Sequence, residues 1–330
     1  MHTADIIHRM WGGMGMQFRI LGPPDLFDEE RRLRTPLTSP KQKRLLGALI
    51  ARPNSFVPRE ELMREIWGGQ APKQARNALN AHFSGLRKTV ETAERARGGQ
   101  ARLVTGADGL MLRVSPAETD SGRFCLAVSR AQGRCRTAPE EAYGILRKAL
   151  PLWRGAVLEG EGPHGPLGAA LAEQLQDVRR RALELLFDAA LSSLRHEDVL
   201  PELRQATVAH PLCERFHDQL MLALCRSGRG GEAIGVYTEA RQRLTAAHGH
   251  TPLLSARLEQ IGAQSPELSA AGAGAPIAPL PLRSPAGREA ARPHRFAVRH
   301  VERADGPAER SALGFLTDLL SGRELYTGRV

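Results

Sequence analysis

One stretch of the chain concentrates side chains that pair with nucleic-acid bases. Residues 75–90 read ARNALNAHFSGLRKTV, and at about 100° per residue of a helix the polar positions fall inside an arc of about 120°. This polar set consists of Arg76, Asn77, Asn80, Ser84, Arg87 and Lys88. Asparagine and arginine bond bidentately to the edges of adenine and guanine. If the stretch is helical, its polar face has the chemistry to read base edges.

The same face has a plainer interpretation, because a charged run on a helix is most often solvated surface. Two features favour DNA contact instead. Glu91 is the one acid beside three bases, and two asparagines, which are poor helix formers, occupy the helix. The apolar side, which predicts packing on a core, consists of Ala75, Leu79, Phe83, Leu86 and Val90. Both interpretations remain open at this point.

The length of the chain limits the number of its domains, and its charge indicates the kind of partner. The chain has 330 residues, 42% of them hydrophobic, which is enough for two or three packed domains. Its formal charge is +10, which favours a polyanionic partner. Residues 1–120 carry 19 basic and 13 acidic side chains, whereas residues 121–268 carry 18 and 17, and residues 269–330 carry 9 and 6. The excess positive charge therefore lies mainly near the N-terminus.

Cysteine usage and hydropathy indicate a soluble protein of the cytoplasm. The four cysteines form no CxxC pair and no dense framework, which is typical of a reducing compartment. The first 15 residues lack the pattern of a secretory signal, and no run approaches 18 apolar residues. We therefore expect cytoplasmic localisation and no membrane partner.

Short strands followed by helices are predicted for the first third of the chain. A strand begins in MQFRILGPPDL (16–26), and a second short strand follows the turn at 28–32. Ser39 and Pro40 are typical of a helix start, and they precede the apolar stripe of 41–51.

A helix-turn-helix and a hairpin follow. Pro58 opens a helix that stops at Gly68, and Pro72 opens the helix with the polar face, which we expect to span 72–91. Residues 103–114 read as a hairpin with its turn at 106–109. This order predicts a winged helix-turn-helix over residues 16–114.

These segments carry a family resemblance. MQFRILGP, SPKQKRLLGALI, ELMREIWGG, PKQARNALNAHFSGLRKTV and the hairpin resemble, in this order, the N-terminal domain of the Streptomyces antibiotic regulatory protein family. That domain is similar to the winged helix of OmpR-type response regulators. The resemblance covers about residues 16–268. SGRFCLAVSRAQ, LWRG and HPLCERFHDQLMLALCRSGR resemble the family's second part, the bacterial transcriptional activation domain.

The chain departs from the family pattern in two places. Family wings carry an aromatic residue after the turn glycine, whereas Leu110 follows Gly109 here, which puts the wing contacts in doubt. Residues 1–15 form an N-terminal extension, and Met14 and Met16 are alternative sites for the start of translation.

The resemblance implies a transcriptional activator of a secondary-metabolite gene cluster. Members bind direct repeats in promoter DNA as side-by-side protomers and recruit RNA polymerase. The implied polymerase-contact loop consists of Gly68, Gly69, Gln70, Ala71 and Pro72. Two alternatives remain: a repressor that binds the same DNA, and an adaptor whose winged helix contacts only proteins.

Roles on DNA follow from position along each element. Recognition helices lead with their N-terminal residues, so Arg76, Asn77 and Asn80 are expected nearest the bases and Arg87 and Lys88 near phosphates. Flanking candidates for backbone or minor-groove contact are Lys41 and Lys43 at the first helix, and Arg102 and Arg113 on the hairpin. A solvated helix end is an equally good interpretation of the two lysines.

The second half contains a 34-residue register, the period of tetratricopeptide repeats. Positions paired at this spacing are Leu186 with Leu220, Ala189 with Ala223, Val199 with Ala233, Leu203 with Tyr237, and Ala206 with Ala240. An all-α, tetratricopeptide-like binding domain is therefore predicted over residues 115–268. Unrelated amphipathic helices that match by chance are the alternative.

No enzyme, metal site or cofactor is predicted. Residues 228–233 fit GxGxxA, but a predicted helix precedes them where a dinucleotide site needs a strand. His210, Cys213 and His217 have ligand-like spacing but lack a fourth ligand. Residues 269–330 have the Ala/Pro/Gly-rich composition of a linker and weakly ordered tail, with one apolar stripe at 311–320, and the chain has no GxxxxGK[ST] loop.

Overall fold

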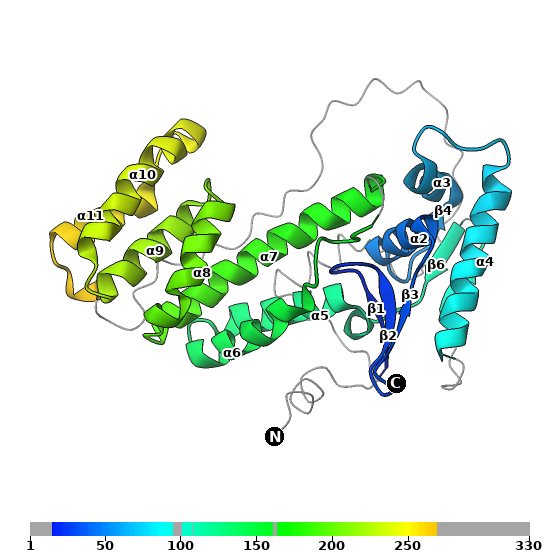
Figure 1. The fold of residues 1–330 in the computed structure, drawn as a ribbon, viewed down its shortest axis with the longest axis horizontal. Helices are drawn as coiled ribbons and strands as arrows, with labels where there is room; N and C mark the ends of the chain where they lie inside the picture. The colour runs from blue at the N-terminus through cyan, green and yellow to red at the C-terminus, as the bar shows by residue number, and fades with distance from the viewer. Residues whose placement is uncertain (1–14, 95–100, 108, 161–163, 269–330) are drawn as a thin grey trace, which may run out of the picture.

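The computed structural model describes residues 15–94, 101–107, 109–160 and 164–268 (Figure 1). Over these residues the chain is mainly helical with two small three-stranded sheets, as the sequence predicts. Residues 1–14 of the expected N-terminal extension and the expected tail at 269–330 lie outside the described residues.

The first sheet holds three antiparallel strands in the order β1-β2-β3: β1 (Met16–Arg19), β2 (Asp25–Asp28) and β3 (Leu33–Pro36). The sequence predicted two strands here, and β2 was missed. Gly22, which has a φ of 145°, and the two prolines after it turn the chain sharply between β1 and β2. A left-handed Arg32 helps to close the next turn.

The winged helix-turn-helix is confirmed, with three helices and a second sheet ordered β4-β6-β5. Its elements are α2 (Pro40–Ala51), β4 (Val57–Pro58), α3 (Arg59–Trp67), α4 (Ala75–Glu94), β5 (Leu103–Thr105) and β6 (Gly109–Leu112). Ser39 caps α2 by accepting from the Gln42 amide, as expected of an N-cap serine. The short strand β4 was not predicted.

Helix α4 begins later than the sequence suggested. Pro72 lies in an exposed turn, in which the Ala75 amide donates to the Pro72 carbonyl, and the helix itself starts at Ala75. The predicted apolar stripe is buried at Leu79, Phe83, Leu86 and Val90, whereas Ala75, the first residue of the helix, is only partly buried. Leu110 is fully buried and pairs with Val57 of β4, so this departure from the family pattern fills the core and offers no wing contact.

The second half is a stack of antiparallel helices. Its elements are η1 (Pro116–Glu118), α5 (Asp120–Arg134), α6 (Pro139–Ala149), η2 (Leu150–Leu152), α7 (Pro166–Ser192), α8 (His196–Ala209), α9 (Glu214–Arg226), α10 (Gly230–His248), α11 (Pro252–Gly262) and η3 (Pro266–Leu268). In Figure 1, α7 runs from the winged helix toward α8–α11 at the far end of the molecule.

The 34-residue register is visible in the turns as well as in the core, where every paired position except the partly buried Tyr237 is buried. Leu194 after α7 and Gly228 after α9 have φ values of 58° and 73°. In both turns the amide of the next residue bonds to a carbonyl of the preceding helix: Arg195 donates to Ala190, and Arg229 donates to Leu224, each at 2.8 Å. This repeated helix ending is a Schellman-like cap, and it confirms the prediction of repeated helix pairs.

The two halves share one hydrophobic core. The amides of Arg154 and Leu158 donate to the carbonyls of Leu21 and Ile20 at 2.7 and 2.9 Å, which joins the α6–α7 connection to the first sheet. The buried Asp120 accepts from the amides of Ile20 and Leu21 and pairs with Arg154 at 3.3 Å. Main-chain bonds and a buried charge therefore both cross the junction.

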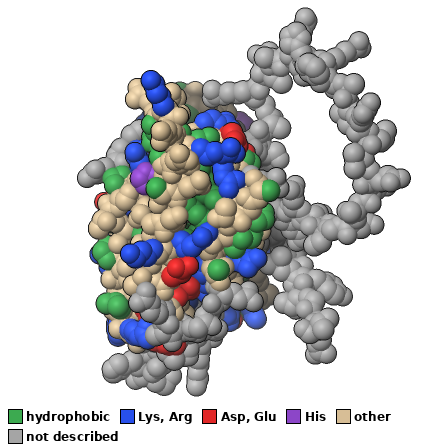
Figure 2. All heavy atoms as spheres, turned by 90° about the vertical axis from the view of Figure 1, so that its right-hand side faces the viewer, with side chains coloured by type: hydrophobic (Ala, Val, Ile, Leu, Met, Phe, Trp, Pro, Cys, Tyr) green, Lys and Arg blue, Asp and Glu red, His purple; other side chains and the backbone are tan. Residues whose placement is uncertain are grey.

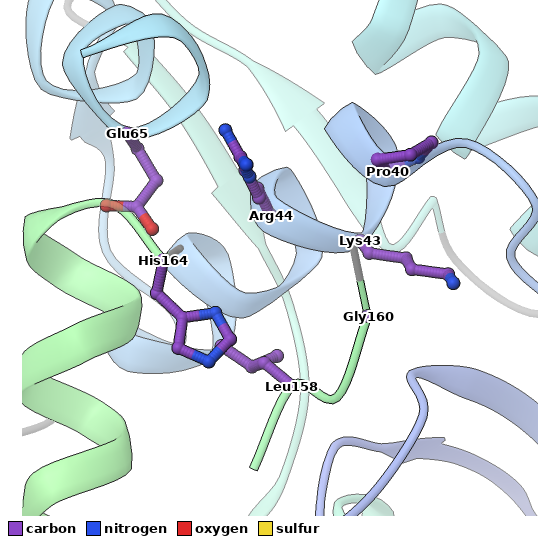
Figure 3. A pocket seen from close by; sticks show the side chains of 7 residues that line it. All are labelled: Pro40, Lys43, Arg44, Glu65, Leu158, Gly160 and His164. Atoms are coloured by element: carbon purple, nitrogen blue, oxygen red, sulfur yellow. The ribbon is translucent and has the colours of Figure 1, made fainter. Parts of the chain in front are cut away.

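A second contact joins α3 to the start of α7. The carboxylate of the buried Glu65 accepts from the amides of Leu167 and Gly168 at 2.8 and 3.1 Å. Figure 3 shows Glu65 beside His164, with Lys43 pointing away from the carboxylate. A carboxylate at a helix N-terminus accepts hydrogen bonds from amides that have no partner within the helix, and its negative charge interacts favourably with the helix dipole. The helix-turn-helix thereby supplies the cap of the longest helix in the second half.

Candidate nucleic-acid interface

The predicted base-reading face is exposed and continuous along α4. Arg76, Asn77, Asn80, Ser84 and Lys88 are all exposed, whereas the apolar stripe faces the core. In Figure 1, α4 lies along one edge of the molecule, and Figure 2 views that side. It shows several groups of Lys and Arg side chains and only small acidic areas. The surface has the charge that phosphates require.

Arg87 differs from the rest of the polar set. It is half-buried, its Nη2 donates to the Thr105 hydroxyl of β5 at 2.9 Å, and its guanidinium lies 5.0 Å from the centre of the Phe83 ring. The side chain is thus directed to the hairpin, not along the exposed face of α4.

The two hairpin arginines are in different environments. Arg102 forms ion pairs with Glu94 at 3.0 Å and Glu118 at 2.6 Å. Burial lowers the pKa of Arg102, but the hydrogen bonds and charges of Glu118 and Glu94 outweigh it, and the pKa is raised. Arg113 is exposed. Since Arg102 already has two carboxylate partners, Arg113 is the better candidate for a phosphate contact.

The two lysines of α2 also lie in different surroundings. Lys41 lies 5.4 Å from the centre of the Trp67 ring, and Trp67 lies 6.1 Å from His82 of α4. Burial, and then the Lys41 charge, lower the pKa of His82. Lys43 instead borders the small pocket at the junction with Gly160 and His164 (Figure 3).

Sequence reasoning missed Trp67 and His82. Trp67 is partly buried at the end of α3, and His82 lies on α4 beside the polar set without belonging to it. Their proximity to Lys41 depends on how three helices cross. The available signal was weak: an aromatic residue at a helix end and a histidine two positions after Asn80.

The loop between α3 and α4 is exposed from residue 68 to residue 74. Gly68 has a φ of 61°, and its amide donates to the Arg64 carbonyl at 2.8 Å. A Cβ at Gly68 or Gly69 would meet no atom within 4 Å, so this glycine pair serves the turn and not close packing. The loop is open to a partner.

The weaker motifs have structural explanations. Gly228–Ala233 forms the turn from α9 to α10 and the first residues of α10. His217 is buried and its Nε2 lies 3.1 Å from the Pro211 carbonyl oxygen. Within the residues described, no three His, Cys, Asp or Glu side chains are grouped to hold a metal ion. No helix of that same part is long and apolar enough to cross a membrane.

Comparison with known proteins decides the family. Residues 34–104 match the family described as transcriptional regulatory protein, C terminal, and residues 119–258 match the bacterial transcriptional activator domain. Transcriptional regulator RedD of Streptomyces coelicolor is 34% identical over 260 residues, covering 77% of this chain and 72% of RedD. The chain belongs to the Streptomyces antibiotic regulatory protein family.

This Streptomyces antibiotic regulatory protein has further relatives. Regulatory protein AfsR of Streptomyces coelicolor is 34% identical over 280 residues, covering 82% of this chain; the chain spans only 27% of AfsR. The solved structure of Mycobacterium tuberculosis EmbR in complex with low affinity phosphopeptide matches with a TM-score of 0.70 and 27% identity. That match covers 76% of this chain and 66% of EmbR. The shared architecture is a winged helix followed by a helical domain.

Proposed function

We propose that this protein binds promoter DNA sequence-specifically through α4 and activates transcription of a secondary-metabolite gene cluster. The observation that carries the proposal is the exposed face of α4. The Arg76 and Lys88 side chains are exposed. They are therefore accessible to a phosphate or to a base edge. The function is binding and needs no catalytic group.

On DNA, the first half of α4 reads bases and its second half contacts the backbone. Arg76, Asn77 and Asn80 lie in the first two turns, where recognition helices meet base edges. Lys88 lies two turns beyond Asn80 and contacts phosphate. Ser84, between them, reaches either a base edge or a phosphate.

A second phosphate contact lies beside α4, at Lys41, Trp67 and His82. The ammonium of Lys41 and the ring N–H groups are donors, and Lys41 is the second residue of α2, whose N-terminal amides attract anions. Arg113 contacts the backbone from the hairpin. Lys43 and Arg102 have no DNA role in this proposal, because the first borders the junction pocket and the second is paired with two carboxylates.

The remaining partners follow from the family. Side-by-side protomers bind direct repeats, the loop of residues 68–72 faces RNA polymerase, and the helical domain holds a protein partner on its repeats. The protein acts in the cytoplasm, where promoter DNA is available. The exposed loop and the stacked helix pairs support these assignments.

The test is to sequence genomic fragments captured by the full-length chain and by the double variant Arg76→Ala, Asn80→Ala. The wild type should enrich a few promoters that contain a short direct repeat, and the double variant should lose them. Arg136→Ala is the matched control, because Arg136 is exposed on the helical half. Recovery of the same diffuse set by both proteins would contradict base reading by α4.

Two further measurements separate the alternatives. If about six phosphates are neutralised, log K should fall with log salt with a slope of about −5; a slope near zero would favour a protein adaptor. A reporter driven by a captured promoter should rise when the protein is expressed. A fall in the reporter would identify a repressor.

A further inference from the structure

Two arginines hold the hairpin of β5 and β6 from different helices. Arg59 is the first residue of α3, and its Nη1 and Nη2 donate to the carbonyls of Ala107 and Gly106 at 2.9 and 3.2 Å. Arg87 in the middle of α4 donates from Nη2 to the Thr105 hydroxyl at 2.9 Å. The turn of the hairpin and the strand before it are thus each bonded to one helix of the helix-turn-helix.

The position of Arg59 is explained by this contact. A cation in the first turn of a helix opposes the helix dipole, and the capping residue Pro58 offers no side-chain acceptor. The planar fork of a guanidinium can donate to two adjacent carbonyls at once, which a lysine ammonium does not reproduce. The two bonds to the turn offset the unfavourable location.

The position of Arg87 is explained in the same way. Its guanidinium lies against the Phe83 ring, and its Nε is buried with no hydrogen-bond partner among the described residues. A surface cation that served only to attract phosphate would keep this N–H in water, because a buried donor without an acceptor is costly. Arg87 instead extends across to Thr105.

Close packing leaves the hairpin little freedom. A Cβ at Gly106 would lie 2.6 Å from the Phe56 ring, and a Cβ at Gly109 would lie 2.1 Å from the Val57 carbonyl oxygen. The backbone of the turn therefore contacts the segment before α3 directly. β4 pairs with Gly109 and Leu110 of β6, so the end of the hairpin next to its turn is held by β4 as well as by the two arginines.

We propose that Arg59 and Arg87 are positioning residues that fix the hairpin against α3 and α4, so that its placement relative to the base-reading face is set before DNA binds. The inference rests on the proposed DNA-binding function. It assigns to Arg87 a role different from the phosphate contact that its sequence position suggested. A hairpin set in advance loses less conformational entropy on binding, so it adds affinity at the groove beside α4.

A double-mutant cycle on DNA tests the role of Arg87. Thr105→Val removes the hydroxyl acceptor while preserving the shape of the side chain. If Arg87 acts through Thr105, Arg87→Ala and Thr105→Val should each weaken binding to a captured promoter several-fold. The two effects should not add, so the affinity of the double variant should equal that of the more weakly binding single variant. Hydroxyl-radical protection should be lost only under the hairpin. If Arg87 contacts phosphate independently, Thr105→Val should have no effect and Arg87→Ala should reduce the salt slope by about 0.9.

Hydrogen exchange in the free protein tests the same inference without DNA. The Gly106 amide donates to the Gly109 carbonyl at 2.9 Å across the turn. Its exchange should accelerate at least severalfold in Arg59→Ala and in Arg59→Lys, and remain unchanged in Arg64→Ala, an exposed arginine of the same helix. Unchanged exchange in both Arg59 variants would overturn the proposal. A wild type that binds no DNA would refute the proposed function, while the exchange result would still decide whether the hairpin is positioned by Arg59.

Discussion

Charged side chains on α4 and charged side chains inside the helical half are used in opposite ways. Arg76 and Lys88 are exposed on α4. In the helical half, Arg257 is 4% exposed and pairs at 2.8 Å with Asp218, which is equally buried. Arg215 pairs with the buried Asp188 at 2.6 Å. The first set is available to a ligand and the second joins α7, α9 and α11.

This difference explains the charge distribution. Residues 121–268 are almost neutral because their 18 bases are accompanied by 17 acids, and many of these face one another across helices. A segment with nearly equal numbers of bases and acids can thus pair its charges internally, whereas a segment with an excess of bases leaves some of them available. A polyanion is attracted where bases lack acids, and buried pairs become costly when one partner is removed.

The largest effect is expected from breaking a buried pair. Asp218→Ala leaves Arg257 buried without its carboxylate and should lower the free energy of unfolding by about 3–5 kcal/mol. Chemical denaturation monitored by circular dichroism measures this. The control is Asp177→Ala, because Asp177 is 62% exposed and lies 3.8 Å from Arg180; it should change stability by less than about 1 kcal/mol. Equal losses in the two variants would contradict the comparison.

A smaller loss is expected at the junction. Glu65→Ala removes the acceptor of the Leu167 and Gly168 amides and should cost about 1–2 kcal/mol. Glu60→Ala, at an exposed site on the same helix, should lower the free energy of unfolding by only a few tenths of a kcal/mol.

Unfolding of the wild type should show whether the two halves are coupled. Because the halves share a core, the near-ultraviolet signals of Trp67 and Trp153 should be lost in a single transition. Two separate transitions would show that the halves unfold independently.

On the DNA-binding side, Lys88→Ala should leave stability unchanged and weaken DNA binding a few-fold. Removing one phosphate contact should also reduce the salt slope by about 0.9. Lys148→Ala is the matched control, since Lys148 is an exposed lysine of α6. A salt titration of affinity distinguishes them; identical slopes for both variants would place the DNA contact elsewhere.

The smallest effect is a pH dependence at His82. Burial and Lys41 lower the pKa of His82 in the free protein, whereas a nearby phosphate raises it in the complex. The complex then binds more protons than the free protein, so affinity should increase as pH falls from about 7.5 to 6, by about two- to threefold. His82→Gln should reduce this increase in a fluorescence anisotropy titration. An equal increase in the variant would show that the imidazole is remote from DNA.

Local patterns were sufficient to predict much of this fold. The apolar stripe of α4, the hairpin and the 34-residue register depend on residues close in sequence or on a simple period, and all three are present. Strand β4 was missed because its partner lies far along the chain, with Val57 paired to Leu110. A two-residue strand ending in proline has no period to detect.

The candidate site was predictable in outline but not in detail. Exposure of Arg76, Asn77 and Asn80 follows from the helical period alone. The environments of Arg87 and Arg102 do not, because Thr105, Glu94 and Glu118 reach them only after the hairpin has folded against α4 and η1. A sequence lists cations, but tertiary contacts determine which of them remain available to bind.

The length of α7 has a consequence for how a partner is presented. Its 27 residues correspond to about 40 Å, slightly more than one turn of B-DNA. The start of the helix is anchored on the helix-turn-helix by Glu65, and its other end carries the outer helix pairs (Figure 1). The helix therefore acts as a rigid spacer. For the partner that we propose on the outer repeats, this length sets the distance from the helix-turn-helix at about the pitch of the duplex, a reach fixed by the fold.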